Sequence, residues 1–142
     1  MWIYYVAILL TILSNVFYHI FQKATPNNVN PILSLLVTYL TAAMLCLVIL
    51  PFYLNGESLT LSLKKISWTS FALGGAVVGL ELGFLLAYRA GWNIGFAGIL
   101  SNGMVALLLI PVGILFFHEK LSLVNILGIL LCFGGLMLIN KK

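Results

Sequence analysis

Residues 67–89 read SWTSFALGGAVVGLELGFLLAYR, a run in which Glu81 is the only charged side chain before the final Arg89. An α-helix needs about 20 consecutive apolar residues to cross the roughly 30 Å hydrocarbon core of a bilayer. The run therefore predicts a transmembrane helix that carries one acidic residue close to the middle of the membrane.

The composition of the whole chain agrees with this interpretation. Of its 142 residues, 63% are hydrophobic and 7% are charged, and the mean hydropathy is +1.17; soluble domains carry about 25% charged residues. The seven Lys and Arg residues are scattered singly or in pairs, so no basic patch for nucleic acid is present. We expect a multi-pass protein of the cell membrane, surrounded by the lipid bilayer and without a nucleic-acid partner.

The remaining sequence divides into apolar runs of similar length, separated by short loops. We predict an all-α integral membrane protein of about five transmembrane helices, forming one domain over residues 1–142. The longest loop, 55–67, has room for a short interfacial turn. The predicted spans are 2–22, 32–54, 67–89, 94–117 and 121–139.

Five spans place the two termini on opposite sides of the membrane, and the basic residues barely distinguish the sides. One side holds Lys64, Lys65 and Lys120. The other holds Lys23, Arg89, Lys141 and Lys142. Since orientation follows the excess of Lys and Arg, two interpretations remain open: insertion in both orientations, or in one orientation that this rule does not identify.

Glu81 is the most unusual residue of the third predicted helix. An ionised carboxylate at this depth costs about 2.5–3.5 kcal/mol on insertion scales. At 100° per residue, Glu81 shares a stripe with Gly74, Val77, Phe84 and Tyr88. Either its carboxyl group is neutral and hydrogen-bonded to a neighbouring helix, or it forms a substrate or proton site in a water-accessible cavity, where Tyr88 orients the substrate.

Polar residues also follow one broad face of the first predicted helix. They either hydrogen-bond other helices or line the same cavity as Glu81. This face consists of Thr11, Ser14, Asn15, Tyr18, His19 and Gln22. The candidate substrate- or proton-binding residues are thus Glu81, Tyr88, Asn15, Tyr18, His19, Ser14 and, from the fourth predicted helix, Asn102.

Small residues recur every four positions on the opposite face of the third predicted helix. They are Gly75, Gly79, Gly83, Ala87 and Gly91. Such residues let helix backbones approach closely in lipid. We expect Gly75, Gly79 and Gly83 to form a helix-packing surface, within the protomer or at a dimer interface.

No catalytic motif is present in the sequence, so we do not expect an enzyme. Cys46 and Cys132 lie within apolar runs and lack the spacing of a metal site. We therefore expect neither a metal nor a cofactor.

The end of the chain resembles a known family. The segment 85–140 is similar to the end of an EamA-like domain of the drug/metabolite transporter superfamily, most clearly over GILFFHEKLSLVNILGILLCFGGLMLIN (113–140). In that family a hydrophobic helix ends in a short loop with Glu, matched here by Glu119, and the last helix contains glycines, matched by Gly128, Gly134 and Gly135. The resemblance extends weakly over the whole chain. Two features depart from the family pattern: Pro111 lies later than the proline expected near Ala106, and Glu81 is not a family hallmark.

The resemblance implies a half-transporter, since many members carry two such repeats in inverted orientation. Transporters of this kind place their site at the interface of the repeats, near the midplane. Two copies of this chain would supply both repeats as an antiparallel homodimer, or a different half-sized protein would pair with it.

Three functions remain open at this point. The first is transport of a small polar or cationic metabolite or drug, with proton coupling through Glu81. The second is the flipping of a lipid-carrier head group, which predicts a lateral opening to the bilayer. The third is a non-transporting membrane interaction protein, in which Glu81 is buried against another helix.

Overall fold

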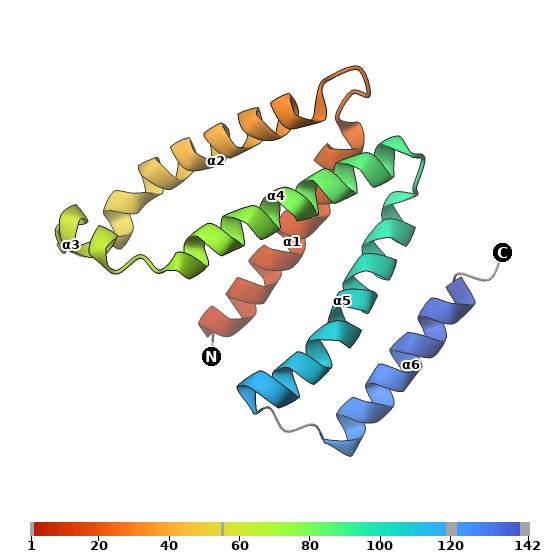
Figure 1. The fold of residues 1–142 in the computed structure, drawn as a ribbon. Coiled ribbons are helices and arrows are strands. Elements are labelled where there is room, and N and C mark those ends of the chain that lie inside the picture. Colours follow the sequence, from red (N-terminus) through yellow and green to blue (C-terminus); the bar gives the residue numbers. More distant parts are fainter. Residues whose placement is uncertain (1, 55, 119–121, 140–142) are drawn as a thin grey trace. The chain divides into compact units, whose positions relative to one another are not determined.

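The computed structural model describes residues 2–54, 56–118 and 122–139, and within these ranges it contains helices and no β-strand (Figure 1). Each predicted span corresponds to one long helix whose ends lie within two residues of the predicted ones, and a short helix occupies the longest loop. An all-α membrane fold is therefore confirmed. The helices are α1 (Trp2–Ala24), α2 (Pro31–Tyr53), α3 (Leu59–Lys64), α4 (Trp68–Arg89), α5 (Ile94–Phe117) and α6 (Leu123–Ile139).

Among the described residues, four helices, α1, α2, α4 and α5, are long and apolar enough to cross a membrane. Helix α6 is equally apolar in character, but it is shorter, with 17 residues. Most large apolar side chains point away from the protein; Phe71, for example, is 78% exposed. Such a surface is stable when lipid rather than water surrounds it.

Helix α2 begins one residue earlier than predicted, and local chemistry explains the difference. The Asn30 side chain accepts hydrogen bonds from the backbone N–H groups of Ile32 (2.9 Å) and Leu33 (3.3 Å). Pro31 occupies the first position of the helix, where its fixed φ is suitable and its missing N–H has no consequence.

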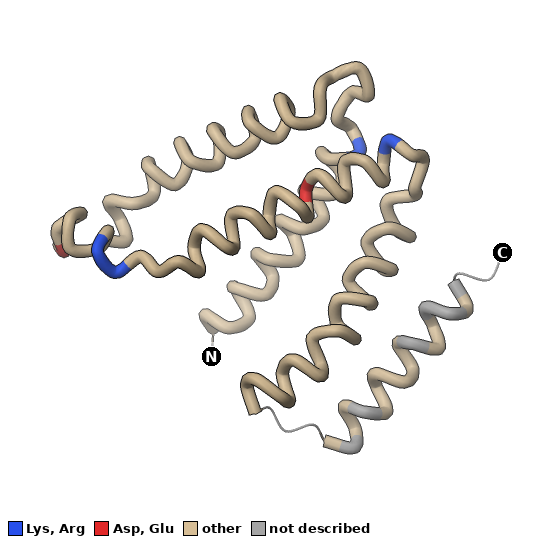
Figure 2. The backbone as a smooth tube through the Cα atoms, in the orientation of Figure 1, with Lys and Arg blue, Asp and Glu red and all other residues tan. Residues whose placement is uncertain are grey.

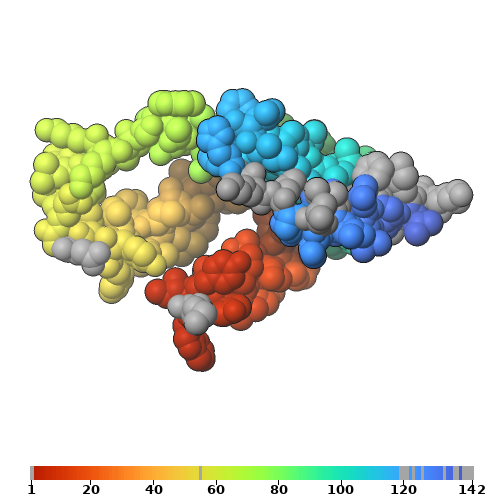
Figure 3. Space-filling model, turned by 90° about the horizontal axis from the view of Figure 1, so that it is seen from below, coloured from red at the N-terminus to blue at the C-terminus, as the bar shows by residue number. Residues whose placement is uncertain are grey.

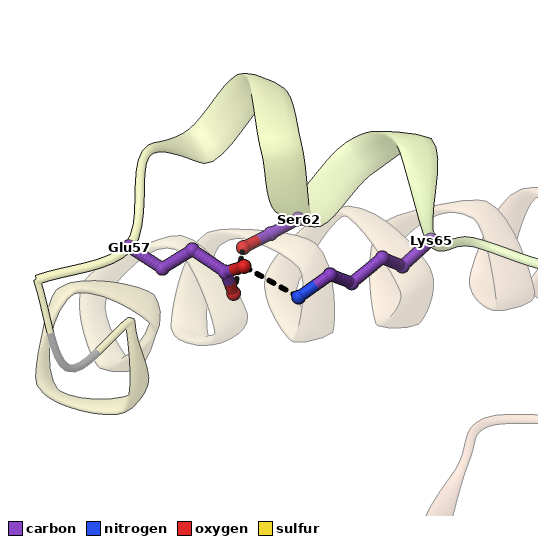
Figure 4. A network of polar contacts seen from close by, with 3 residues as sticks. All are labelled: Glu57, Ser62 and Lys65. Carbon is purple, nitrogen blue, oxygen red and sulfur yellow. Dashed lines mark hydrogen bonds and ion pairs between the residues drawn. The ribbon is translucent and has the colours of Figure 1, made fainter.

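Helix α3 is the short turn expected in the loop before the third span. Glu57, just before this helix, accepts a hydrogen bond from the Ser62 hydroxyl (3.1 Å) and forms an ion pair with Lys65 (Figure 4). Leu61 and Leu63 stay about half exposed. Apolar side chains beside charged ones are typical of a segment at the membrane surface.

The chain forms two compact units, and each is described by itself. Unit 1 comprises Met1–Ile20 and Gly91–Lys142, and unit 2 comprises Phe21–Ala90. In unit 2, α2 and α4 pack against one another and run in opposite directions (Figure 1). In unit 1, α5 and α6 pack in the same antiparallel manner. That the five spans form one domain stays a prediction.

Candidate functional site

Unit 2 contains every charged residue that the structure describes, and only one of them lies away from its ends. Figure 2 shows one acidic position along α4, between the charged positions near α3 and those near the end of α4. This residue is Glu81, eight residues before Arg89 and hence about 12 Å along the helix axis from the end of α4. Such a position lies within the hydrocarbon core of a bilayer.

Glu81 is oriented toward α2. Its face of α4 also carries Leu85 and Tyr88, which are 1% and 4% exposed. These spacings of four and seven residues correspond to one side of a helix. The face that the sequence assigns to Glu81 is therefore the face of α4 that packs within unit 2.

Tyr39 of α2 lies beside the Glu81 carboxyl group. The two groups are close enough to interact, although they do not adopt the geometry of a hydrogen bond. Both Glu81 Oε2 and Tyr39 Oη are shielded from solvent and lack a hydrogen-bond partner among the described residues. Buried polar atoms of native proteins nearly always have a partner, so this pair is a candidate binding group.

A groove lined by Tyr39, but not by Glu81, extends along the first half of α4. Its volume is about 500 Å³, and its lining is almost entirely apolar. In Figure 3 an opening separates α2 (yellow to orange) from the first part of α4 (light green). The groove is lined by Tyr39, Ser70, Leu73, Gly74, Val77 and Val78.

The last turn of α1 also reaches α4 within unit 2. The Gln22 side chain donates a hydrogen bond to the backbone carbonyl of Glu81 (3.3 Å). Lys23 Nζ donates to the carbonyl of Tyr88 (3.2 Å) and lies 5.6 Å from the centre of its ring. Gln22 thus bonds a neighbouring helix, which is one of the two roles open for the polar face of the first helix.

Tyr88 lies near the end of α4, on the same face as Glu81. It is almost fully buried, its ring stacks on that of Phe84 with 6.0 Å between centroids, and Lys23 approaches it. That Tyr88 orients a substrate stays a prediction.

The other candidate residues of the first and fourth predicted helices lie in unit 1. His19 is buried and approaches α5 at Gly98, where an added Cβ would lie 3.7 Å from His19 Nε2. The Tyr18 and His19 rings contact each other edge to face, with centroids 5.2 Å apart. Ser14, Asn15 and Asn102 are exposed within the described chain. Whether they line a cavity stays a prediction.

No described residue of unit 2 lies within contact distance of the glycine face of α4. A Cβ built at Gly75, Gly79 or Gly83 meets no atom of unit 2 within 4 Å. Gly91 lies beyond the end of α4 in a turn with φ of +97°, so it does not extend the helix-packing face as the four-residue spacing had predicted. Packing of the three remaining glycines against another helix stays a prediction.

Sequence reasoning missed Tyr39. Two hydroxyl residues beside it in the second span, Thr38 and Thr41, donate hydrogen bonds to carbonyls of their own helix, at Ser34 (3.1 Å) and Val37 (2.9 Å). The available signal was the position of Tyr39 itself, a lone tyrosine in the interior of an apolar span. Tyrosine hydroxyls buried in apolar surroundings usually have a polar partner.

These features define a class of protein: a multi-pass helical membrane protein with a polar pair inside its hydrocarbon-spanning part. The family model of the EamA-like transporter family matches residues 2–141. The chain therefore belongs to this family, whose members are membrane transporters of the drug/metabolite type. No curated protein and no solved structure matches the chain.

Proposed function

We propose that this protein transports a small polar or cationic metabolite or drug across the membrane, in exchange for protons that bind to Glu81. The observation that supports this proposal is the Glu81 carboxyl group, which lies within a spanning helix and has an oxygen without a hydrogen-bond partner in the described chain. Acids inside membrane segments usually mark substrate or proton pathways.

The chemistry follows from the low dielectric constant of the surroundings. Desolvation favours the neutral carboxyl group, whereas a bound cation favours the carboxylate. Binding of a cationic substrate then releases the proton, and departure of the substrate allows a proton to bind again. Because the Glu81 carboxyl group binds either a proton or the substrate, movement of protons in one direction is coupled to movement of substrate in the other.

We further propose that the working unit is a pair of repeats, formed by two copies in antiparallel orientation or by this chain and a related one. Family resemblance and the near balance of basic residues between the two sides support this arrangement.

Replacement of the acid tests the coupling. Purified protein in liposomes with an imposed pH gradient is first offered a panel of cationic drugs and polar metabolites, and the best-accumulated compound is then used for variants. We expect Glu81→Gln, which keeps the shape of the side chain and removes the exchangeable proton, to lower gradient-driven uptake to that of protein-free liposomes while the protein stays folded.

Glu57→Gln is the matched control, because Glu57 precedes α3 and pairs with Lys65 outside the spanning helices. It should retain uptake. Undiminished gradient-driven uptake by Glu81→Gln would show that Glu81 is a structural acid, and proton coupling through it would be wrong.

One observation also favours the flipping of a lipid-linked head group. The groove between α2 and α4 is open on one side within unit 2 (Figure 3), as a site for a molecule with a lipid tail requires. Transfer of a fluorescent lipid-linked sugar between leaflets, in the absence of uptake of any soluble compound, would favour this second function.

A further inference from the structure

The face between α2 and α4 combines a polar end with an apolar groove. The polar end is the pair of Glu81 and Tyr39, which lie beside one another and each have a shielded oxygen without a hydrogen bond of ordinary geometry in the described part of the chain. Such atoms are costly to bury. A ligand that supplies hydrogen-bond donors would remove this cost.

A cation would stabilise the ionised Glu81 carboxylate, and the described residues of unit 2 do not supply one. No ion pair involving Glu81 occurs among the described residues. Two basic groups of unit 2 contact backbone carbonyls instead: Lys23 contacts that of Tyr88, and Arg89 Nη2 contacts those of Pro26 and Val29. The described residues of unit 2 therefore supply no cation to Glu81, and a cationic ligand would fill this role.

The groove sets the shape of that ligand. Gly74 and Val77 line it on the same side of α4 as Glu81, seven and four residues earlier. From Ser70 to Glu81 the helix rises about 16 Å. Gly74 has no side chain, and a Cβ added there would meet nothing within 4 Å, so the groove is open at this point. Its volume of about 500 Å³ lies within the usual range of small-molecule sites, roughly 300–1,000 Å³.

We propose that this groove and the Tyr39–Glu81 pair form one binding site for amphipathic amines. The ammonium group of the ligand binds the Glu81 carboxylate and the Tyr39 oxygen, and its apolar body lies along Gly74 and Val77. An ammonium group has three donors, enough for both oxygens. The inference rests on the proposed function, because it names the substrate class of the same acid, and it adds Tyr39 and the groove wall as determinants of specificity.

A series of primary n-alkylamines, from butylamine to octylamine, tests the site by equilibrium dialysis against protein in nanodiscs, with binding to empty nanodiscs subtracted. We expect affinity to rise by roughly fourfold per methylene group, as burial of each CH₂ from water predicts. Tyr39→Phe should weaken the binding of every amine by about tenfold, since it removes a hydrogen bond to a charged group. Octanol, which lacks the ammonium group, should bind far more weakly than octylamine.

Gly74→Leu fills the groove without touching Glu81. In this variant we expect amine affinity to rise less steeply with chain length than in the parent. The affinity for butylamine should stay within about twofold of the parent value. Thr69→Leu is the matched control, since Thr69 is exposed, lies outside the groove wall and precedes Gly74 in the same helix; it should behave as the parent. Val77→Phe fills the same groove from another lining position. It replaces Gly74→Leu in the test if that variant does not fold.

The outcomes separate this inference from the proposed function. Unchanged octylamine binding in both groove-filling variants would overturn the groove site, even if soluble cations were still transported. Equal binding of octanol and octylamine would overturn the role of the acid and tyrosine. Chain-length-dependent binding that is lost in Gly74→Leu would support the site, even if no amine crossed the membrane and the transport proposal failed.

Discussion

Arg89 joins the end of α4 to the turn between α1 and α2. One of its guanidinium nitrogens, Nη2, donates to the carbonyl oxygens of Pro26 (3.1 Å) and Val29 (2.7 Å). The turn itself holds a further hydrogen bond, from the Val29 N–H to the Pro26 carbonyl (3.3 Å). A single side chain at the end of one span thus fixes the loop that connects two others.

We expect Arg89→Gln to loosen this loop. Hydrogen bonds from a charged group contribute about 1.5–3 kcal/mol, so the variant should be destabilised by about that amount and its 26–30 backbone should exchange hydrogen faster. Thermal unfolding in detergent and hydrogen–deuterium exchange measure the two effects. Lys64→Gln, which removes a basic residue at the opposite end of unit 2, is the control; equal exchange in both variants at 26–30 would show that Arg89 does not hold the turn.

At the scale of the element, α4 presents two faces of different character. One carries Glu81, Leu85 and Tyr88 and packs within unit 2, while the other carries Gly75, Gly79 and Gly83 and contacts none of the described residues of that unit. Small residues on a spanning helix permit close backbone approach by a second helix. The open face is therefore suited to contact with a further helix, from elsewhere in the chain or from a second copy.

We predict that Gly79→Leu weakens assembly or folding, because Gly79 lies at the centre of this face and a bulky side chain prevents close approach. Gly79→Ala should have a smaller effect, since one methyl group separates the backbones less. Leu80→Phe, on a different side of the helix where Leu80 is 51% exposed, controls for added bulk.

Size-exclusion chromatography with light scattering and thermal unfolding in detergent give the two readouts. A Gly79→Leu protein that is as stable and as well assembled as the parent would show that the glycine face contacts lipid, and the assignment of the two faces would have to be reversed.

At the scale of the whole molecule, the distribution of basic residues bears on orientation in the membrane. In unit 2 the basic residues are balanced, with Lys23 and Arg89 near one end of α4 and Lys64 and Lys65 near the other. Over the whole sequence, three basic residues on one side face four on the other. Since such a small difference provides little orienting bias, an antiparallel pair is compatible with this distribution.

We expect labelling from outside the cell to reach only about half of the molecules at position 142, as equal insertion in both orientations predicts. Lys142→Cys, with Cys46 and Cys132 replaced by Ala, is treated with an impermeant maleimide before and after permeabilisation. Lys64→Cys in the same background is the control, because it lies on the other predicted side and should show the same partial labelling. Complete labelling or complete protection at position 142 would contradict the antiparallel homodimer.

The fold of this protein follows largely from local sequence. A spanning helix requires only an apolar run as long as the bilayer is thick, and the five runs predicted in this way correspond to α1, α2, α4, α5 and α6. The depth of Glu81 and the two faces of α4 also follow from local sequence, because they depend on helix rise and on 100° per residue. The short helix α3 could be expected from the length and polarity of its loop.

The candidate site depended on tertiary structure. Sequence identified Glu81 but not Tyr39, and it treated Lys23 and Arg89 as loop charges, although both contact backbone carbonyls. Periodicity shows which side of a helix a residue occupies, but not which helix lies opposite. Tyr39 and Glu81 are 42 positions apart in the chain, and only the packing of α2 against α4 brings them together. The sequence alone therefore determined the spans and the buried acid, and the tertiary structure decided which residues surround that acid, because contacts between distant segments arise from helix packing.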